Sequence, residues 1–126
     1  MSRVLIVDDD LHVREVLRDF LTRVGDEVET AATGAAALEA VPTFQPDVIL
    51  LDMVMPGMSG ADVLDALRQA GFTVPVILIS GHPITPPEGF FAFLKKPFDL
   101  RKLAELVTAA VSDGASPSVP RWTRGG

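Results

Sequence analysis

The feature that most constrains the fold of this chain is a repeated alternation between short, β-rich apolar runs and longer stretches with helical spacing. Such an alternation is typical of a parallel sheet with helices packed on both of its faces. It predicts an α/β domain whose strands cover Val4–Val7, Glu27–Ala31, Asp47–Leu51, Val74–Ile79 and Phe91–Leu94. The third run is continuously apolar after its first acid, as expected for a central strand buried on both faces.

Helix signals occupy four stretches of the chain. From Leu11 onward the apolar residues recur at i, i+3, i+4, i+7 and i+8, which is the spacing of an amphipathic helix. We expect Thr33, Ser59 and Asp99 to cap the three later helices, because their side-chain oxygens can accept the free N–H groups of a first turn. The expected ends of the first three helices are, in chain order, Gly25, Pro42 and Gly71.

The interval from Ser80 to Phe90 gives weak support for a helix. Pro83, Pro86 and Pro87 each lack a backbone donor, and glycines near both ends add flexibility. We expect a loop there, or at most one helical turn, so the fourth helix of the alternating pattern is shortened or missing.

The length of 126 residues fits one domain, which we place at residues 1–112, with residues 113–126 as a disordered tail of Ser, Gly, Pro and Arg. The absence of cysteine excludes a disulfide framework, a thiolate zinc site and a thiol nucleophile. No apolar run approaches the ~18 residues that a membrane helix needs. We therefore expect a soluble, cytoplasmic protein with no membrane partner.

The charge of the chain bears on its partners. The formal net charge is -6, from 17 acidic and 11 basic residues, and the basic residues do not cluster in the sequence. An excess of carboxylates repels the phosphate backbone of nucleic acids. Direct nucleic-acid binding is therefore not expected.

Polar residues follow the predicted strands with regularity. Asp8 and Asp9 follow the first strand, Asp52 the third, Ser80 the fourth and Lys96 the fifth. The carboxyl ends of parallel strands meet at one edge of a sheet, and ligands bind there near the topological switch point. The pattern predicts a crevice that holds three carboxylates, one hydroxyl and one ammonium.

Clustered carboxylates repel one another unless a cation neutralises them. A site with oxygen ligands only favours a hard ion, and an open crevice with few carboxylates suits Mg²⁺, which keeps several waters. We therefore expect Mg²⁺ as the cofactor.

The chain resembles a receiver domain of bacterial two-component response regulators over about residues 2–112. The segments that carry the resemblance are VLIVDDDLHVREVL, DVILLDMVMPGMSG, VPVILISG and FLKKPFDLRKL. Each segment alone is weakly specific, but the set in this order is highly specific. The resemblance implies a flavodoxin-like, doubly wound, five-stranded parallel sheet of order 2-1-3-4-5, in a single-domain form.

The resemblance also implies roles for the residues of the crevice. Asp52 would be the phosphoacceptor, and Asp8, Asp9 and Asp52 would hold Mg²⁺ together with the backbone carbonyl of Val54. Ser80 would bond a phosphoryl oxygen and Lys96 would pair with the phosphate. Phe93 would rotate into the space that Ser80 vacates, although simple core packing of Phe93 remains equally open.

The implied function is that of a signal receiver. It would take a phosphoryl group from a histidine kinase, a hybrid kinase or a phosphotransfer protein, and then switch conformation or relay the group. It would catalyse only its own phosphorylation and dephosphorylation, so it is not expected to be a turnover enzyme. We expect no output domain among the residues after the last predicted helix, and the sequence does not identify the downstream partner.

Two other readings remain open. One is a phosphorylation-independent protein-binding module of the same fold, against which the complete set of site residues argues. The other is a Mg²⁺-dependent phosphatase with an aspartyl nucleophile, which would normally need a second acid where Val54 stands.

Neighbouring residues receive simpler interpretations. We expect Asp10 to cap the first helix, Lys95 to be solvated, and His12 not to be a ligand. His82 is expected to overlook the phosphoryl site, and Trp122 to be a chance apolar residue of the tail. The resemblance favours a cis Lys96–Pro97 peptide, whereas Phe93 departs from the tyrosine common in the family.

Overall fold

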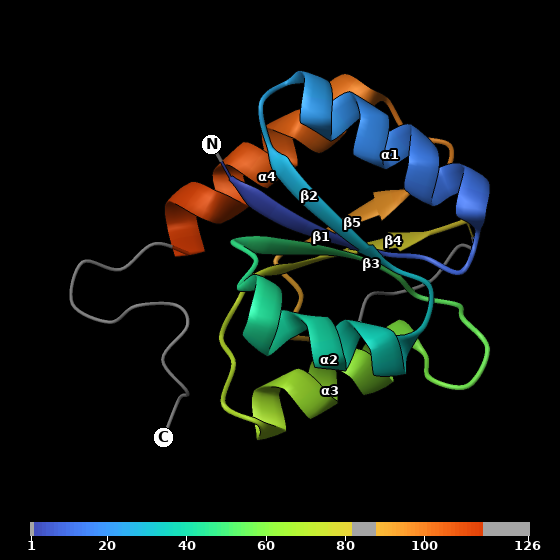
Figure 1. Cartoon of the computed structure of the whole chain (residues 1–126), viewed down its shortest axis with the longest axis vertical. Helices are drawn as coiled ribbons and strands as arrows, with labels where there is room; N and C mark the ends of the chain where they lie inside the picture. Colours follow the sequence, from blue (N-terminus) through green and yellow to red (C-terminus); the bar gives the residue numbers. More distant parts are fainter. Residues whose placement is uncertain (1, 82–87, 115–126) are drawn as a thin grey trace.

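The computed structural model describes residues 2–81 and 88–114. Five strands form one parallel sheet in the order β2-β1-β3-β4-β5, which confirms the predicted topology (Figure 1). The strands are β1 (Arg3–Val7), β2 (Glu27–Ala31), β3 (Val48–Asp52), β4 (Val76–Ser80) and β5 (Ala92–Lys95).

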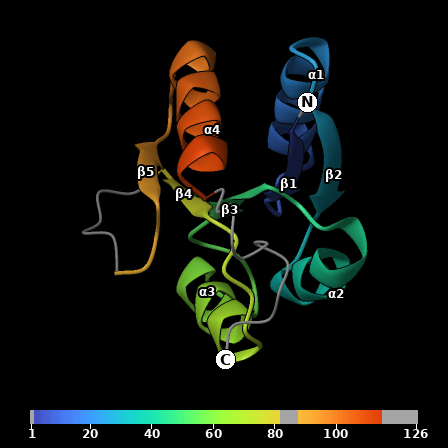
Figure 2. The same cartoon turned by 90° about the vertical axis from the view of Figure 1, so that its left-hand side faces the viewer.

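The described residues contain four helices, which cover both faces of the sheet as predicted. They are α1 (Leu11–Arg23), α2 (Gly34–Phe44), α3 (Gly60–Gln69) and α4 (Leu100–Gly114). Figure 2 shows α1 and α4 on one side of the sheet and α2 and α3 on the other. This is the doubly wound architecture: the chain moves from β1 to β2 in one direction along the sheet and then in the opposite direction toward β5, so right-handed crossovers place helices on both faces.

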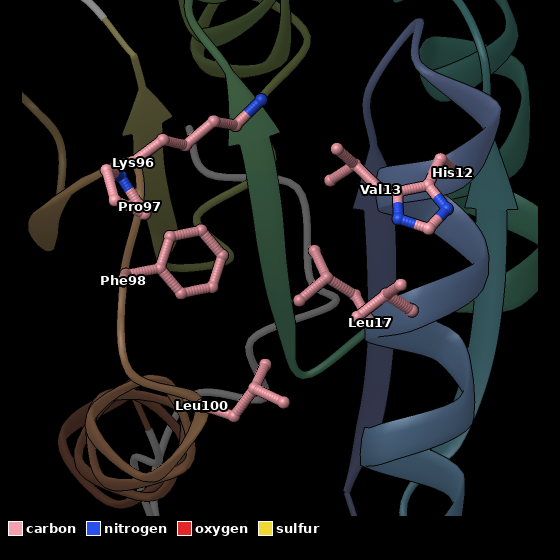
Figure 3. A pocket seen from close by; sticks show the side chains of 8 residues that line it. His12, Val13, Leu17, Lys96, Pro97, Phe98 and Leu100 are labelled. Carbon is pink, nitrogen blue, oxygen red and sulfur yellow. The ribbon is translucent and has the colours of Figure 1, made fainter.

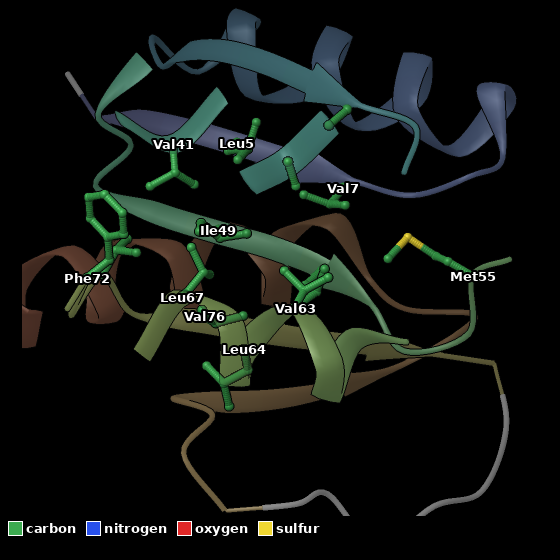
Figure 4. Packing of buried hydrophobic residues seen from close by; sticks show 14 residues of the cluster. Leu5, Val7, Val41, Ile49, Met55, Val63, Leu64, Leu67, Phe72 and Val76 are labelled. Carbon is green, nitrogen blue, oxygen red and sulfur yellow. The ribbon is translucent and has the colours of Figure 1, made fainter. Parts of the chain in front are cut away.

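Alternate residues of the central strands pack into two separate hydrophobic cores, one on each face of the sheet. In β1, Val4 and Ile6 pack beneath α1 and α4, whereas Leu5 and Val7 pack against α2 and α3 (Figure 4). Every residue of β3 and β4 is buried. A strand covered on both faces needs no polar side, which explains the continuous apolar run that identified β3.

Three of these strands end one residue later than predicted, at Asp52, Ser80 and Lys95. The strand β4 begins only at Val76, because Pro75 has no N–H for the ladder. Asp52 and Ser80 are therefore held by the sheet itself rather than by a loop.

The predicted helix caps are confirmed. The Asp10 carboxylate accepts the N–H groups of His12 and Val13, and the Thr33 hydroxyl accepts that of Ala36. Ser59 forms a reciprocal capping box with Asp62, and Asp99 accepts the N–H of Arg101. Each cap satisfies a donor that has no partner within its helix, and this fixes where each helix begins.

The prediction that Pro42 ends the second helix is wrong. The helix α2 continues to Phe44 and ends at Gln45, whose φ of 56° is left-handed. Pro42 removes only its own donor, while the turn that contains it keeps Val41 fully buried and packs Phe44 against the core. The guanidinium of Arg3 also donates to the Phe44 carbonyl, 2.8 Å from Nε, and so satisfies the end of the helix.

Several predictions concern residues at the limits of the described structure. Gly81 and Glu88–Phe91 lie in no helix, but the shortened or missing fourth helix otherwise falls on residues 82–87, outside the described residues. His82, Trp122 and residues 115–126 of the predicted tail lie outside them as well, whereas residues 113 and 114, predicted to begin that tail, belong to α4.

Candidate functional site

Three carboxylates converge at the carboxyl edge of the sheet. Asp8 and Asp9 directly follow β1, and Asp52 is the last residue of the neighbouring strand β3. One oxygen from each carboxylate lies within 4.8 Å of those from the other two. The structure therefore brings together the three acids that the strand-end argument grouped.

The three acids differ in exposure. Asp8 and Asp52 are 2% and 7% exposed, whereas Asp9 faces solvent. The site is therefore partly buried, and Asp9 is its solvent-exposed member. Such a set of oxygen donors fits Mg²⁺, which binds through a few carboxylates and retains waters.

Lys96 supplies the nearest cation among the described residues. Its Nζ lies 3.0 Å from Oδ2 of Asp8 and 3.9 Å from Oδ1 of Asp52. Lys95 is exposed, as predicted, and the Lys96–Pro97 peptide is cis. One ammonium beside three carboxylates leaves the cluster with excess negative charge.

Burial and the neighbouring charges together set the pKa of Asp52. Burial, and next the charge of Asp8, raises the pKa of Asp52 to about 6 from its usual 3.8. Lys96 and the N–H of Val54 act in the opposite direction but do not cancel the rise. The ionised carboxylate is therefore under-compensated, and a bound cation would stabilise it.

The side chain of Asp8 is held at both of its oxygens. Oδ1 accepts the N–H of Asp10 at 2.9 Å, and Oδ2 accepts from Lys96. The main-chain carbonyl of Asp8 accepts in addition from Arg14, whose Nη1 lies 2.7 Å away. The sequence did not predict this role of Arg14, because a hydrogen bond from a side chain to a backbone carbonyl produces no recognisable pattern in the sequence.

Gly60 lets the start of α3 approach the end of β3. A Cβ atom at this position would lie 2.9 Å from the carbonyl oxygen of Asp52 and 3.0 Å from Cα of Met53. The N–H of Gly60 donates to the Met53 carbonyl at 2.9 Å. Only glycine allows this contact with the strand that carries Asp52.

Ser80 and Phe93 lie on adjacent strands. Ser80 is fully buried, and Phe93 is half-buried opposite Leu78 in the β4–β5 register. Paired residues of parallel strands face the same side of a sheet, so Ser80 and Phe93 share the face that α2 and α3 partly cover. Phe93 is therefore on the same face as the predicted switch hydroxyl. Val54 is 54% exposed in the loop that follows Asp52.

An apolar groove of about 380 Å³ lies beside the carboxylates, between α1 and the chain that follows β5. Figure 3 shows Lys96, Pro97, Phe98 and Leu100 on one side and His12, Val13 and Leu17 on the other. His12 lines this groove and is not part of the three-carboxylate cluster.

Comparison with known proteins gives a consistent family. The family model for the response regulator receiver domain matches residues 4–108. The DNA-binding transcriptional regulator NtrC of Klebsiella pneumoniae is 37% identical over 122 residues, which are 92% of this chain and 26% of that protein. The transcriptional regulatory protein KdpE of Mycobacterium tuberculosis is 38% identical over 117 residues, which are 88% of this chain and 51% of that protein. The chain thus spans about a quarter to a half of these relatives.

Solved structures agree with this result. The receiver domain of the Francisella response regulator 1452 superposes with a TM-score of 0.84 at 27% identity, covering 91% of this chain and all of that one (100%). The response regulator protein TrrA of Thermotoga maritima, in complex with Mg²⁺ and BeF, gives 0.80 at 30% identity and covers 87% of this chain and 99% of its own. Within the described part of the chain, no helix is long and apolar enough to cross a membrane.

Proposed function

The chain belongs to the response regulator receiver domain family, and from this premise we propose that it accepts a phosphoryl group on Asp52, with Mg²⁺ bound, in cytoplasmic two-component signalling. The donor would be a histidine kinase, a hybrid kinase or a phosphotransfer protein. The observation that carries the proposal is the convergence of the Asp8, Asp9 and Asp52 carboxylates, with the ammonium of Lys96 beside Asp8 and Asp52.

The metal would be held by the three carboxylates and by the backbone carbonyl of Val54. When bound, Mg²⁺ supplies the positive charge that lets an anionic carboxylate and an anionic phosphoryl group approach each other. The raised pKa of Asp52 supports this role, because burial and the charge of Asp8 disfavour the ionised carboxylate, which a bound cation would stabilise.

The residues of the chain itself provide the nucleophile and much of the positioning. An oxygen of Asp52 forms a bond to phosphorus while the bond between phosphorus and the donor's histidine nitrogen breaks, which leaves an aspartyl phosphate and a free histidine. Lys96 can pair with the developing charge on the phosphoryl oxygens, and the Ser80 hydroxyl can donate to one of them. Catalysis is then confined to the protein's own modification and its reversal.

Phosphorylation would change the conformation of the protein through movements of Ser80 and Phe93. Movement of the Ser80 hydroxyl toward the phosphoryl group would vacate space on the face that it shares with Phe93. Because Phe93 is only half-buried, its ring could move without opening either of the two cores. We assign the conformational output to this pair, and leave the downstream partner open.

An acyl phosphate tests the proposal without a kinase. The protein is incubated with Mg²⁺ and acetyl phosphate, and its intact mass is followed with and without a chelator. We expect a gain of one phosphoryl group that needs Mg²⁺ and disappears in Asp52→Asn. No gain with this donor or with any histidine kinase would instead favour the phosphorylation-independent binding module. Repeated turnover on phosphate monoesters would favour the phosphatase.

A further inference from the structure

We propose that Arg14 is a positioning residue for the metal site, because its guanidinium holds the peptide that joins Asp8 to Asp9. This inference rests on the proposed function, since it concerns the two residues assigned to Mg²⁺. Its central observation is the 2.7 Å hydrogen bond from Nη1 of Arg14 to the carbonyl oxygen of Asp8.

Arg14 is tied to the loop between β1 and α1 at two points. Its backbone N–H donates to the carbonyl of Asp10 at 3.1 Å, as the first bond of α1. Its side chain reaches back to the carbonyl of Asp8, six residues earlier. Backbone and side chain of one residue thus hold both ends of the segment Asp8–Asp10.

The bond fixes the orientation of the Asp8–Asp9 peptide, because it holds the carbonyl oxygen of that peptide. The N–H of Asp8 is already anchored to the carbonyl of Ala31 in β2, but the Asp8 carbonyl lies past the end of the β1 ladder. Rotation of the Asp8–Asp9 peptide would swing the exposed Asp9 carboxylate relative to the buried one of Asp8. Since a metal ion requires both ligands in a fixed geometry, holding this peptide prepares the site before the ion arrives.

The location of Arg14 argues against a role in the helix alone. A cation near the N-terminus of a helix opposes the macrodipole, so its charge gains nothing from α1. Arg14 is half-buried, whereas Arg18, one turn further along α1, is exposed. The structure therefore offers a matched pair of arginines on the same helix, of which only Arg14 touches the site.

Calorimetric titration of the full chain with MgCl₂ at constant ionic strength tests the inference. Arg14→Met keeps the alkyl packing and removes the donor, and we expect its Mg²⁺ dissociation constant to rise by about 10-fold or more. Arg14→Lys retains the charge and one donor nitrogen, so its dissociation constant should fall between those of this variant and the wild type. Arg18→Met is the control and should stay within about twofold of the wild type, because its charge is screened.

The sign of the change decides between explanations. Loss of a positive charge near a cation site would by itself tighten Mg²⁺ binding. A purely structural role would lower the melting temperature and leave the dissociation constant unchanged. Equal or tighter binding by folded Arg14→Met, or by Arg14→Lys if the first variant does not fold, would overturn the inference. Failure of the wild type to bind Mg²⁺ would instead refute the proposed function.

Discussion

Lys96 is closer to Asp8 than to Asp52: its Nζ lies 3.0 Å from the carboxylate of the former and 3.9 Å from that of the latter. The ammonium thus lies beside the two buried carboxylates of the cluster, nearer to Asp8. There it offsets part of the carboxylate repulsion before any metal or phosphoryl group is bound. Lys96 therefore stabilises the carboxylates in the free protein and competes with Mg²⁺ for them.

This geometry predicts opposite effects of Lys96→Met on two measurements. Mg²⁺ should bind several-fold more tightly, because the competing cation is gone. Phosphoryl uptake from acetyl phosphate at saturating Mg²⁺ should slow by about 100-fold, because the charge on the phosphoryl oxygens loses its partner. Calorimetry gives the first quantity and the rate of mass gain the second.

Lys95→Met provides the control for that experiment. It removes the same charge one residue earlier, from a side chain that is exposed. Both quantities should remain near their wild-type values. If the two variants behave alike, the effect reflects net charge and not the position of Lys96.

The raised pKa of Asp52 predicts an unusual pH dependence of stability. An acid whose pKa is about 6 when folded and 3.8 when unfolded binds its proton more tightly in the folded protein. Between about pH 4 and pH 6 the ionisation of Asp52 therefore lowers the free energy of unfolding, and the loss is complete above pH 6. Asp52→Asn should be more stable than the wild type at pH 7.5 without Mg²⁺, by on the order of 2 kcal/mol.

Urea denaturation at pH 4.5 and pH 7.5 measures this difference. The gap between the two proteins should be largest at the higher pH and should shrink when Mg²⁺ is added, because the ion stabilises only the carboxylate form. A gap that does not change with pH would show that Asp52 ionises without penalty.

Gly60 is expected to tolerate no side chain. In Gly60→Ala the new methyl group would press on the Asp52 carbonyl at 2.9 Å, so we expect a loss of about 1–3 kcal/mol in the free energy of unfolding. Gly81→Ala is the matched control, since its Cβ would lie 3.9 Å from Lys96 Cβ in an ordinary contact. Equal stabilities of the two variants in urea would contradict the close approach of α3 to β3.

Ser80→Ala separates phosphoryl uptake from its readout. The variant keeps the Asp52 nucleophile and Lys96, so uptake from acetyl phosphate should persist, slowed by about 10-fold through loss of one donor. The NMR signals of the Phe93 ring should shift on phosphorylation in the wild type and stay in place in Ser80→Ala. A shift of equal size in both proteins would show that Phe93 responds by another route.

Much of the fold could be predicted from the sequence because each element carries its own signal. The continuous apolar run before Asp52 indicated a buried central strand, and capping side chains such as Asp10 and Ser59 marked where helices begin. The sheet order came from the family resemblance. Local rules failed at Pro42, where burial of Val41 and the bond from Arg3 to Phe44 outweigh the loss of one helical donor.

The part of the candidate site that lies at strand ends could be predicted from the sequence. Parallel strands deliver their last residues to one edge, so Asp8, Asp52 and Lys96 could be grouped without coordinates. The roles of Arg14 and Gly60 were not predicted, because both depend on contacts with backbone atoms. Arg14 donates to a backbone carbonyl, and Gly60 allows a close approach of α3 to β3. Side-chain patterns in a sequence do not report such contacts.

The central claim is that Asp52 receives the phosphoryl group, and chemical mapping of the modified residue tests it most directly. Protein treated with acetyl phosphate and Mg²⁺ is reduced with borohydride, which converts an aspartyl phosphate to homoserine, and its peptides are then sequenced by mass spectrometry. The account predicts homoserine at position 52 and at no other aspartate, only when Mg²⁺ is present. Homoserine at Asp8 or Asp9, or none at all in protein that binds Mg²⁺, would contradict it.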